Sequence, residues 1–216
     1  MKKSKVKICG LTNLADARFA AGAGADYVGF IFVEGTPRYI EPAMVGAISE
    51  WVEGPNKVGV FQNQELSSVT ETARLVGLDM IQLHGQESTE YCSLLSENHR
   101  IIKVFSVDEQ TNSADLSREL QGYKNVCEYI MFDTKVGSQS GGTGVSFDWK
   151  LINELDIPLP YFLSGGLSHE TVNEAFEVLS GNPPMAIDVS SKIEERIGIK
   201  DFDKLSLFME AVQSTT

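Results

Sequence analysis

The segment from Lys57 to His84 reads KVGVFQNQELSSVTETARLVGLDMIQLH and contains one complete strand–helix–strand unit. Its two ends, Lys57–Phe61 and Met80–His84, are short, nearly continuous apolar runs, which are typical of strands buried on both faces. The region between them has apolar residues at the spacing of one helix face, and Gly77 stands where such a helix should end. Those apolar positions are Leu66, Val69, Ala73 and Val76. This order predicts two parallel strands joined by a helical crossover.

The same unit recurs along the chain. Helical spacing returns in Val172–Leu179, for which Ser168 is a candidate N-cap, and in Leu205–Val212, which follows Asp201. Eight strands that alternate with helices in 216 residues favour a closed, parallel (β/α)8 barrel, the TIM barrel, over an open doubly wound sheet. We therefore expect residues 1–216 to form one α/β barrel domain with outer helices. The eight candidate strands are Val6–Leu11, Tyr27–Phe32, Lys57–Phe61, Met80–His84, Ile101–Val107, Tyr129–Asp133, Tyr161–Ser164 and Ala186–Ser190.

Composition and charge exclude several classes of protein. The chain has 18 Lys and Arg against 30 Asp and Glu, and its net charge is −12. This charge argues against nucleic acid or an anionic membrane as a partner, but it allows one small phosphorylated ligand. Three cysteines that lie far apart, with no CxxC motif, exclude a disulfide scaffold and suit a reducing compartment. The sequence shows neither a signal peptide nor a run of about 20 apolar residues, so we expect a cytoplasmic protein.

The first candidate strand carries a cation and a thiol. In such barrels the functional residues stand at the carboxyl ends of the strands and in the loops that follow. Alternation places Lys7 and Cys9 on one face of the strand, and a thiol beside a cation loses its proton more easily. The alternative is that Cys9 is a small buried apolar residue, as free cysteines usually are.

The sixth candidate strand ends in a carboxylate. Asp133 occupies a position that is typical of catalytic residues in these barrels, and its alternative role is a cap for the next loop. That loop, residues 135–145, contains Gly142 and Gly144 among several glycines. Glycine lets the backbone approach a ligand closely, so this loop is a candidate for substrate binding and for a mobile lid.

Small residues follow the last two strands. Gly165 and Gly166 come after the seventh strand, and Ser190 and Ser191 come after the eighth. Backbone N–H groups in these two loops form the common phosphate site of such barrels, although two tight turns would also explain the residues. Asp188 should point into the barrel, where it suits a sugar hydroxyl.

Two further residues are candidates for contact with a substrate. Arg38 follows the second strand in a loop that Pro37 stiffens, and its guanidinium suits a planar anion such as a carboxylate, although a solvated surface arginine is the alternative. His84 ends the fourth strand, either as an acid or base in the site or as a structural histidine. No cluster of three His, Asp or Glu ligands stands out, so we expect no metal.

These residues, in this order, resemble the phosphoribosylanthranilate isomerase family of tryptophan biosynthesis. One of the motifs alone would be weak, but the ordered set is specific and spans nearly the whole chain. The matching segments are Lys7–Thr12, Thr36–Ile40, Val58–Phe61, Leu83–Glu87, Phe132–Thr134, Gly141–Gly144, Phe147–Trp149, Leu163–Leu167 and Asp188–Ser191.

The resemblance implies an Amadori rearrangement of the aminoaldose N-(5-phosphoribosyl)anthranilate to its 1-deoxyribulose isomer. It implies that Asp133 is the general acid that opens the sugar ring and that Cys9 is the general base that removes the C2 proton. A thiolate base needs a lowered pKa, and Lys7 is the candidate cause. Arg38 would hold the anthranilate side of the substrate, and proton transfer needs neither a cofactor nor a metal.

Three positions depart from the pattern of the family. Lys192-Ile193 stand where the family usually has Gly then Val, Ser164 stands in place of Ala, and Gln62 stands in place of Val. They leave open a diverged enzyme of the same barrel class, such as a pentose-phosphate epimerase or an indole-pathway synthase that would use Lys7 and Lys103. A non-catalytic sugar-phosphate binder is a third possibility. The sequence leaves a monomer and a homodimer equally open.

Overall fold

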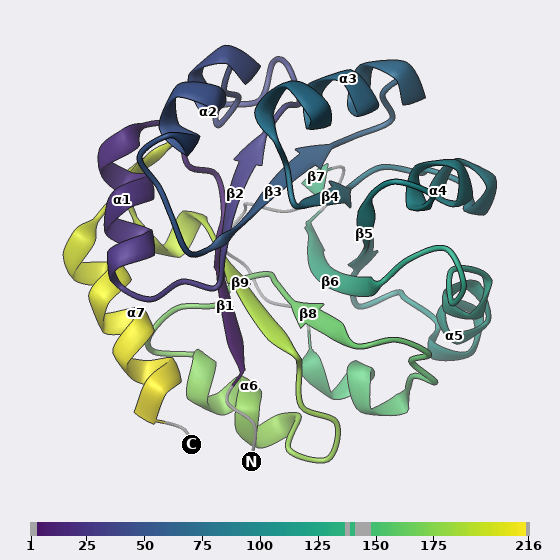
Figure 1. Ribbon diagram of the computed structural model, residues 1–216. Helices are drawn as coiled ribbons and strands as arrows, with labels where there is room; N and C mark the ends of the chain where they lie inside the picture. The colour runs from purple at the N-terminus through teal and green to yellow at the C-terminus, as the bar shows by residue number, and fades with distance from the viewer. Residues whose placement is uncertain (1–3, 137–138, 141–147, 215–216) are drawn as a thin grey trace.

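A closed barrel of eight parallel strands forms the centre of the molecule (Figure 1). The computed structural model describes residues 4–136, 139–140 and 148–214. The strand order is β5-β4-β3-β2-β1-β9-β8-β6, and pairing of β6 with β5 closes the ring, so the predicted TIM barrel is confirmed. The strands are β1 (Lys5–Ile8), β2 (Tyr27–Ile31), β3 (Asn56–Phe61), β4 (Met80–Leu83), β5 (Arg100–Val107), β6 (Tyr129–Val136), β8 (Tyr161–Leu163) and β9 (Ala186–Val189).

Each predicted apolar run contains one barrel strand, and only the ends differ. The first strand ends at Ile8, so Cys9 lies just beyond it. β6 runs past Asp133 to Val136, because its last residues pair in antiparallel fashion with the short strand β7 (Gln139–Ser140). The strand β6 therefore extends into the predicted loop, because β7 provides hydrogen-bond partners for its last residues.

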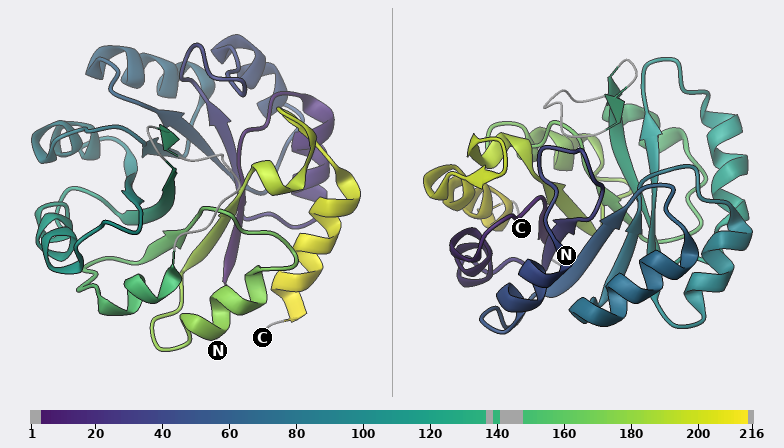
Figure 2. Two further views of the ribbon diagram at one scale, coloured as in Figure 1. Left: turned by 180° about the vertical axis from the view of Figure 1, so that it is seen from behind. Right: turned by 90° about the horizontal axis from the view of Figure 1, so that it is seen from above.

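Helices surround the barrel, as the left view in Figure 2 shows. One predicted helix start is wrong: the turn at Ser168 precedes the helix, which begins at Val172, and the Ser168 hydroxyl accepts a hydrogen bond from Glu170 N. The helices are α1 (Leu14–Gly22), α2 (Pro42–Ser49), α3 (Leu66–Val76), α4 (Thr89–Ser96), α5 (Ser113–Gly122), α6 (Val172–Val178) and α7 (Phe202–Ser214), with the 3-10 helices η1 (Trp149–Glu154) and η2 (Ser191–Ile193). A small hairpin, β10 (Glu194–Arg196) and β11 (Ile199–Lys200), precedes α7.

Two apolar layers hold the fold together. One lines the inside of the barrel and includes Tyr27, Val58, Ile102, Val104 and Phe162. The other lies between the strands and the helices, and it is the larger of the two. Successive side chains of a strand point to opposite faces. Lys103, which lies on β5 between Ile102 and Val104, therefore points into the outer layer.

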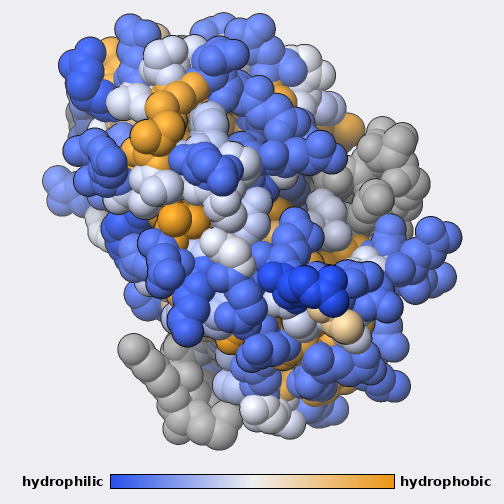
Figure 3. Space-filling model, turned by 90° about the vertical axis from the view of Figure 1, so that its right-hand side faces the viewer, coloured by the Kyte–Doolittle hydropathy of each residue, from blue (hydrophilic) through white to orange (hydrophobic). Residues whose placement is uncertain are grey.

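The outside of the molecule is mostly hydrophilic on the side that carries α4 and α5 (Figure 3). Its apolar spots there are scattered, as is ordinary for a protein surface. In the described part of the chain, no helix has both the length and the apolar character needed to cross a membrane.

Candidate active site

A buried ion pair joins the first and last strands of the barrel. The register of β1 with β9 places Lys7 opposite Asp188, and Lys7 Nζ lies 2.7 Å from Asp188 Oδ1. The second carboxylate oxygen accepts a hydrogen bond of 3.1 Å from Ser164 Oγ at the end of β8. Burial alone would lower the pKa of Lys7, but the attraction of Asp188 and Cys9 outweighs it and raises that pKa. Lys7 is therefore a fixed positive charge beside the thiol.

Cys9 lies next to this charge in a space that only a glycine leaves open. A Cβ built on Gly29 would lie 2.8 Å from Cys9 Sγ and 3.1 Å from Lys7 Nζ, so any side chain there would displace both groups. Burial raises the pKa of the Cys9 thiol, and the positive charge of Lys7 offsets only part of that effect. The expectation of a lowered pKa is thus wrong, because the buried thiol loses its contact with water.

Asp133 lies near His84 at the same end of the barrel. Asp133 Oδ1 accepts a hydrogen bond of 2.8 Å from Thr134 N, and Asp133 Oδ2 is 3.4 Å from His84 Nε2. That contact is close enough for an ion pair but is not aligned as a hydrogen bond, and His84 Nε2 has no hydrogen-bond partner among the described residues. Both oxygens of the carboxylate therefore face a nitrogen.

The candidate phosphate loops have the backbone shapes expected of close approach. Gly165 and Gly166 have φ values of 91° and 69°, which favour glycine, and a Cβ on Gly165 would collide with Thr134. Ser190 Oγ is buried and has no hydrogen-bond partner among the described residues, and Ser191 begins η2. Gly142 and Gly144 lie outside the described residues.

Arg38 is held by a residue that sequence reasoning missed. Its Nε and Nη2 donate to the two oxygens of Glu194, each at 2.8 Å. Glu194 Oε1 also accepts from Lys200 Nζ at 3.1 Å; burial works against ionisation of Glu194, but these partners hold its pKa below the usual value. The hydrogen bonds to Glu194 in turn raise the pKa of Arg38. Arg38 Nη1 has no acceptor in the described part of the chain, so it is the nitrogen through which Arg38 can bind an anion.

The geometry of Arg38 predicts the effect of replacing its guanidinium. Arg38→Lys should raise the KM for the substrate at least tenfold while kcat changes less, because an ammonium cannot bind Glu194 and a second anion in one plane. Steady-state kinetics measures both constants. Arg118→Lys, at an exposed ion pair with Asp115, is the matched control and should change neither. An unchanged KM in Arg38→Lys would show that Arg38 binds only Glu194.

The fold and these residues define a class of protein: a (β/α)8-barrel enzyme with its polar residues at the carboxyl ends of the strands. The described residues contain no group of three His, Cys, Asp or Glu that could hold a metal ion. Residues 6–211 match the family model described as N-(5'phosphoribosyl)anthranilate (PRA) isomerase. The chain belongs to this family of isomerases.

Individual relatives agree with this assignment. The chain is 41% identical to N-(5'-phosphoribosyl)anthranilate isomerase of Thermotoga maritima, across 95% of this chain and 97% of the relative. It is 39% identical to the enzyme of the same name from Nitrosomonas eutropha, across 97% of each chain.

Solved structures of such isomerases have the same fold. The crystal structure of the Thermotoga maritima isomerase superposes with a TM-score of 0.85 at 37% identity and covers 98% of this chain and 99% of its own. An isomerase in complex with reduced 1-(o-carboxyphenylamino)-1-deoxyribulose 5-phosphate superposes with a TM-score of 0.82 at 36% identity, with the same coverage. A third structure, of monomers derived from the dimeric Thermotoga maritima isomerase, has a TM-score of 0.82 at 37% identity, again covering 98% and 99%.

Proposed function

We propose that this protein converts N-(5'-phosphoribosyl)anthranilate to 1-(2-carboxyphenylamino)-1-deoxyribulose 5-phosphate, a step of tryptophan biosynthesis. Asp133 is the general acid, and Cys9 is the general base. The observation that carries the proposal is the placement of a thiol and a carboxylate, each with a polar partner, at the carboxyl ends of β1 and β6 in a member of this family. Each of the two roles contributes on the order of 10²–10⁴ in rate, or about 3–5 kcal/mol.

The first step opens the sugar ring. Asp133 in its protonated form gives its proton to the ring oxygen, and the bond between that oxygen and C1 breaks as the nitrogen lone pair forms a C1=N bond. The result is an open-chain Schiff base that carries a positive charge on nitrogen. Thr134 N and His84 restrict the rotation of the Asp133 carboxyl group, which supports transfer along one direction.

The second step moves a proton from C2. Cys9 as a thiolate takes that proton, and the electron pair flows into the positively charged C1=N group to form an enolamine. Protonation at C1 and loss of the C2 hydroxyl proton then give the ketone. The cationic Schiff base also explains how a thiol with a raised pKa can act: a positive charge beside Cys9 favours the thiolate, as Lys7 does.

The remaining candidates bind the substrate. Lys7 and Asp188 suit sugar hydroxyls, His84 contacts the reacting end, and Arg38 Nη1 faces the anthranilate carboxylate. A second set forms the phosphate site, which we propose on the resemblance together with the glycine φ values and the Ser190 hydroxyl, which has no hydrogen-bond partner among the described residues. That set is Gly165, Gly166, Ser190 and Ser191, whereas Gly142 and Gly144, which lie outside the described residues, are proposed to bind the substrate on the resemblance alone.

Lys192 offers a test of the phosphate site. It lies exposed in η2, directly after Ser191. Lys192→Gly should weaken the affinity for a phosphorylated product analogue by roughly two- to fivefold, the effect of one solvent-exposed charge, and should flatten its salt dependence. Calorimetric titration at several ionic strengths measures both. If affinity and salt dependence stay as in the wild type, Lys192 points away from the phosphate.

A coupled fluorescence assay tests the function directly. Phosphoribosylanthranilate is generated in place, and its fluorescence should fall faster when this protein is added. A folded protein that binds sugar phosphate but leaves the signal unchanged would refute the isomerase. The indole-pathway synthase receives no support from the lysines, because Lys103 lies on the outward face of β5 and cannot reach a ligand inside the barrel.

The remaining expectations concern partners and location. We propose a small phosphorylated substrate as the ligand, and the complex solved for the related isomerase supports this. Both a monomer and a homodimer remain consistent with the related structures. A single domain over residues 1–216, a cytoplasmic location and independence of metals and cofactors stay predictions.

A further inference from the structure

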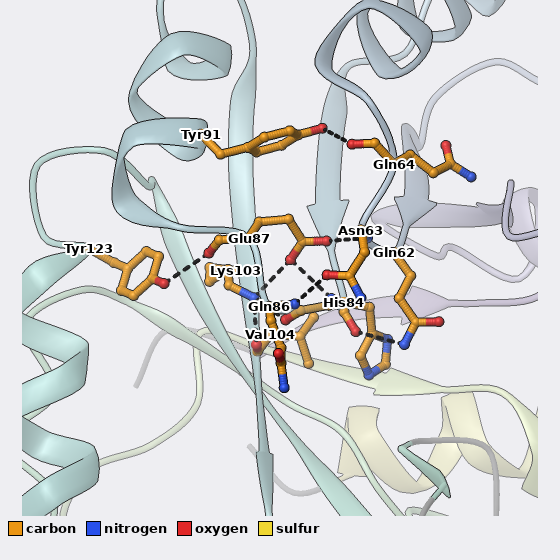
Figure 4. Close-up of polar contacts among 11 residues, drawn as sticks. Gln62, Asn63, Gln64, His84, Gln86, Glu87, Tyr91, Lys103, Val104 and Tyr123 are labelled. Carbon is orange, nitrogen blue, oxygen red and sulfur yellow. Dashed lines mark hydrogen bonds and ion pairs between the residues drawn. The ribbon is translucent and has the colours of Figure 1, made fainter.

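A second buried ion pair lies beside the site, and the proposed reaction does not use it. Lys103 Nζ is 3.0 Å from Glu87 Oε2, and the two side chains are only 3% and 2% exposed. Lys103 stands on β5 between Ile102 and Val104, which face the lumen, so the pair lies in the outer layer, against which α4 packs. Figure 4 shows this pair at the centre of a network of polar contacts.

A buried ion pair of this kind adds little to the free energy of unfolding. Removing two charges from water costs several kcal/mol per ion, and uncharged side chains of similar volume often serve as well or better. Lys103 instead has all three of its donors placed: to Glu87 Oε2, to Gly85 O at 2.7 Å and to Val104 O at 3.3 Å. A buried charge whose hydrogen bonds are all formed holds the groups around it in fixed positions.

The ion pair holds the backbone of Gly85. Lys103 Nζ donates to the carbonyl oxygen of Gly85, and the N–H of Gly85 donates to Glu87 Oε2 at 3.0 Å. Both polar groups of this one residue are therefore held by the two members of the pair. A Cβ on Gly85 would collide with Asn63 Oδ1 and Glu87 Oε1, so side chains also pack closely against this backbone.

The same carboxylate ties in the loop after β3. Glu87 Oε1 accepts from Asn63 N at 2.8 Å, and Asn63 Oδ1 accepts from Gln86 N at 2.7 Å. Among the described residues, Asn63 is the one non-glycine with a left-handed φ, at 51°. Such a backbone persists only where its surroundings determine it, and here Glu87 and Gln86 do so.

The fixed loop carries His84, the residue before Gly85. His84 N donates to Phe61 O at 2.8 Å, so the backbone of His84 is held by β3 on one side and by Gly85 on the other. Its imidazole lies 3.4 Å from Asp133 Oδ2. A shift of the loop would therefore move the imidazole relative to Asp133.

We propose that Lys103 and Glu87 are positioning residues, which hold the loop after β4 so that His84 lies against Asp133. This rests on the proposed function, in which Asp133 is the acid. An acid must lie within hydrogen-bond reach of the atom it protonates, and a misplacement of about 1 Å can cost on the order of a hundredfold in rate. Thr134 N holds Asp133 Oδ1 by a hydrogen bond, and the His84 imidazole lies against Asp133 Oδ2 at 3.4 Å.

The first test separates positioning from stability. Lys103→Met should lower kcat at least tenfold with KM within twofold, and the unpaired Glu87 should lower the melting temperature. The double variant Lys103→Met/Glu87→Gln leaves no unpaired charge, so it should regain melting temperature while kcat stays low. Arg100 lies on the same strand as Lys103 and forms an exposed ion pair with Glu128. Arg100→Met is therefore the matched control and should change neither kcat nor the melting temperature. Recovery of kcat together with stability in the double variant would overturn the proposal.

The second test asks whether Lys103 acts through His84. In a double-mutant cycle, Lys103→Met should cost nothing further once His84→Ala is present. If the two losses multiply, the proposal is wrong. An inactive wild type would refute the isomerase function instead, whereas an active wild type with unaffected variants would refute only the positioning role.

A spectroscopic readout works without turnover. The chain has three histidines, so the imidazole nitrogen signals of a histidine-labelled sample are few. The His84 signal should respond to Asp133→Asn in the wild type, and this response should be lost in the Lys103→Met background. A response that persists there would overturn the proposal whatever the activity.

Discussion

Asp133→Asn is expected to lower kcat at least a hundredfold while the protein stays folded. An amide has nearly the shape of the carboxyl group, so it can still accept from Thr134 N and lie beside His84. It cannot give a proton to the ring oxygen, and general acid catalysis is worth on the order of 10²–10⁴ in rate. The coupled fluorescence assay measures the loss, and thermal unfolding checks the fold.

The matched control for Asp133→Asn is Asp26→Asn. Asp26 directly precedes β2, at the other end of the barrel, where its carboxylate accepts a hydrogen bond of 2.9 Å from Val6 N. Its replacement should leave kcat within a few-fold of the wild type. Turnover like that of the wild type in Asp133→Asn would remove Asp133 from the role of acid.

Cys9→Ala should also lower kcat at least a hundredfold, because it removes the proposed base, and the Asp188 carboxylate beside Lys7 is already bonded to Lys7 and Ser164. The affinity for a product analogue should change little, since the loss removes one sulfur atom and leaves the pair of Lys7 and Asp188 intact. Cys92→Ala, at a buried cysteine on α4 outside the barrel, is the control and should keep its turnover. Turnover in Cys9→Ala close to that of the wild type would exclude the thiol as the base.

The pH dependence of the same thiol follows from its surroundings. Burial raises the pKa of Cys9, so the thiolate fraction, and with it the rate of alkylation by iodoacetamide, should climb about tenfold per pH unit through neutral pH. Lys7→Met should shift this profile to still higher pH, because the charge of Lys7 lowers the pKa whereas that of Asp188 raises it. A variant without Cys92 and Cys127 isolates the signal. A profile that levels off below pH 7 would contradict the prediction.

Much of the fold was predictable because its signals are local. Short apolar runs such as Tyr27–Phe32, which are rich in β-branched and aromatic residues, favour strands, and a helix between two of them leaves few topologies open. The exceptions depend on neighbours: β6 continues to Val136 only because β7 pairs with it, and the helix after Ser168 starts later because a turn uses the Ser168 hydroxyl first.

The placement of Asp133 and Asp188 on barrel strands was predictable from the order of the apolar runs, while their roles stay predictions. It was not predictable where the role depends on which loops meet. Glu194 is 156 residues from Arg38 along the chain, and the hairpin that brings it there has no strong pattern of its own. The raised pKa of Cys9 was missed for a similar reason, since the degree of burial depends on the whole barrel and not on Lys7 alone.

The pairing of Lys7 with Asp188 also has a consequence for biosynthesis on the ribosome. The two residues are 181 positions apart, so the Lys7 ammonium has no counter-charge until β9 has been translated. A nascent chain that lacks β9 would have to bury Lys7 without a partner, which costs several kcal/mol. We therefore expect the barrel to close cooperatively, after β9 has been synthesised. A chain that is truncated before residue 188 should be degraded by proteases.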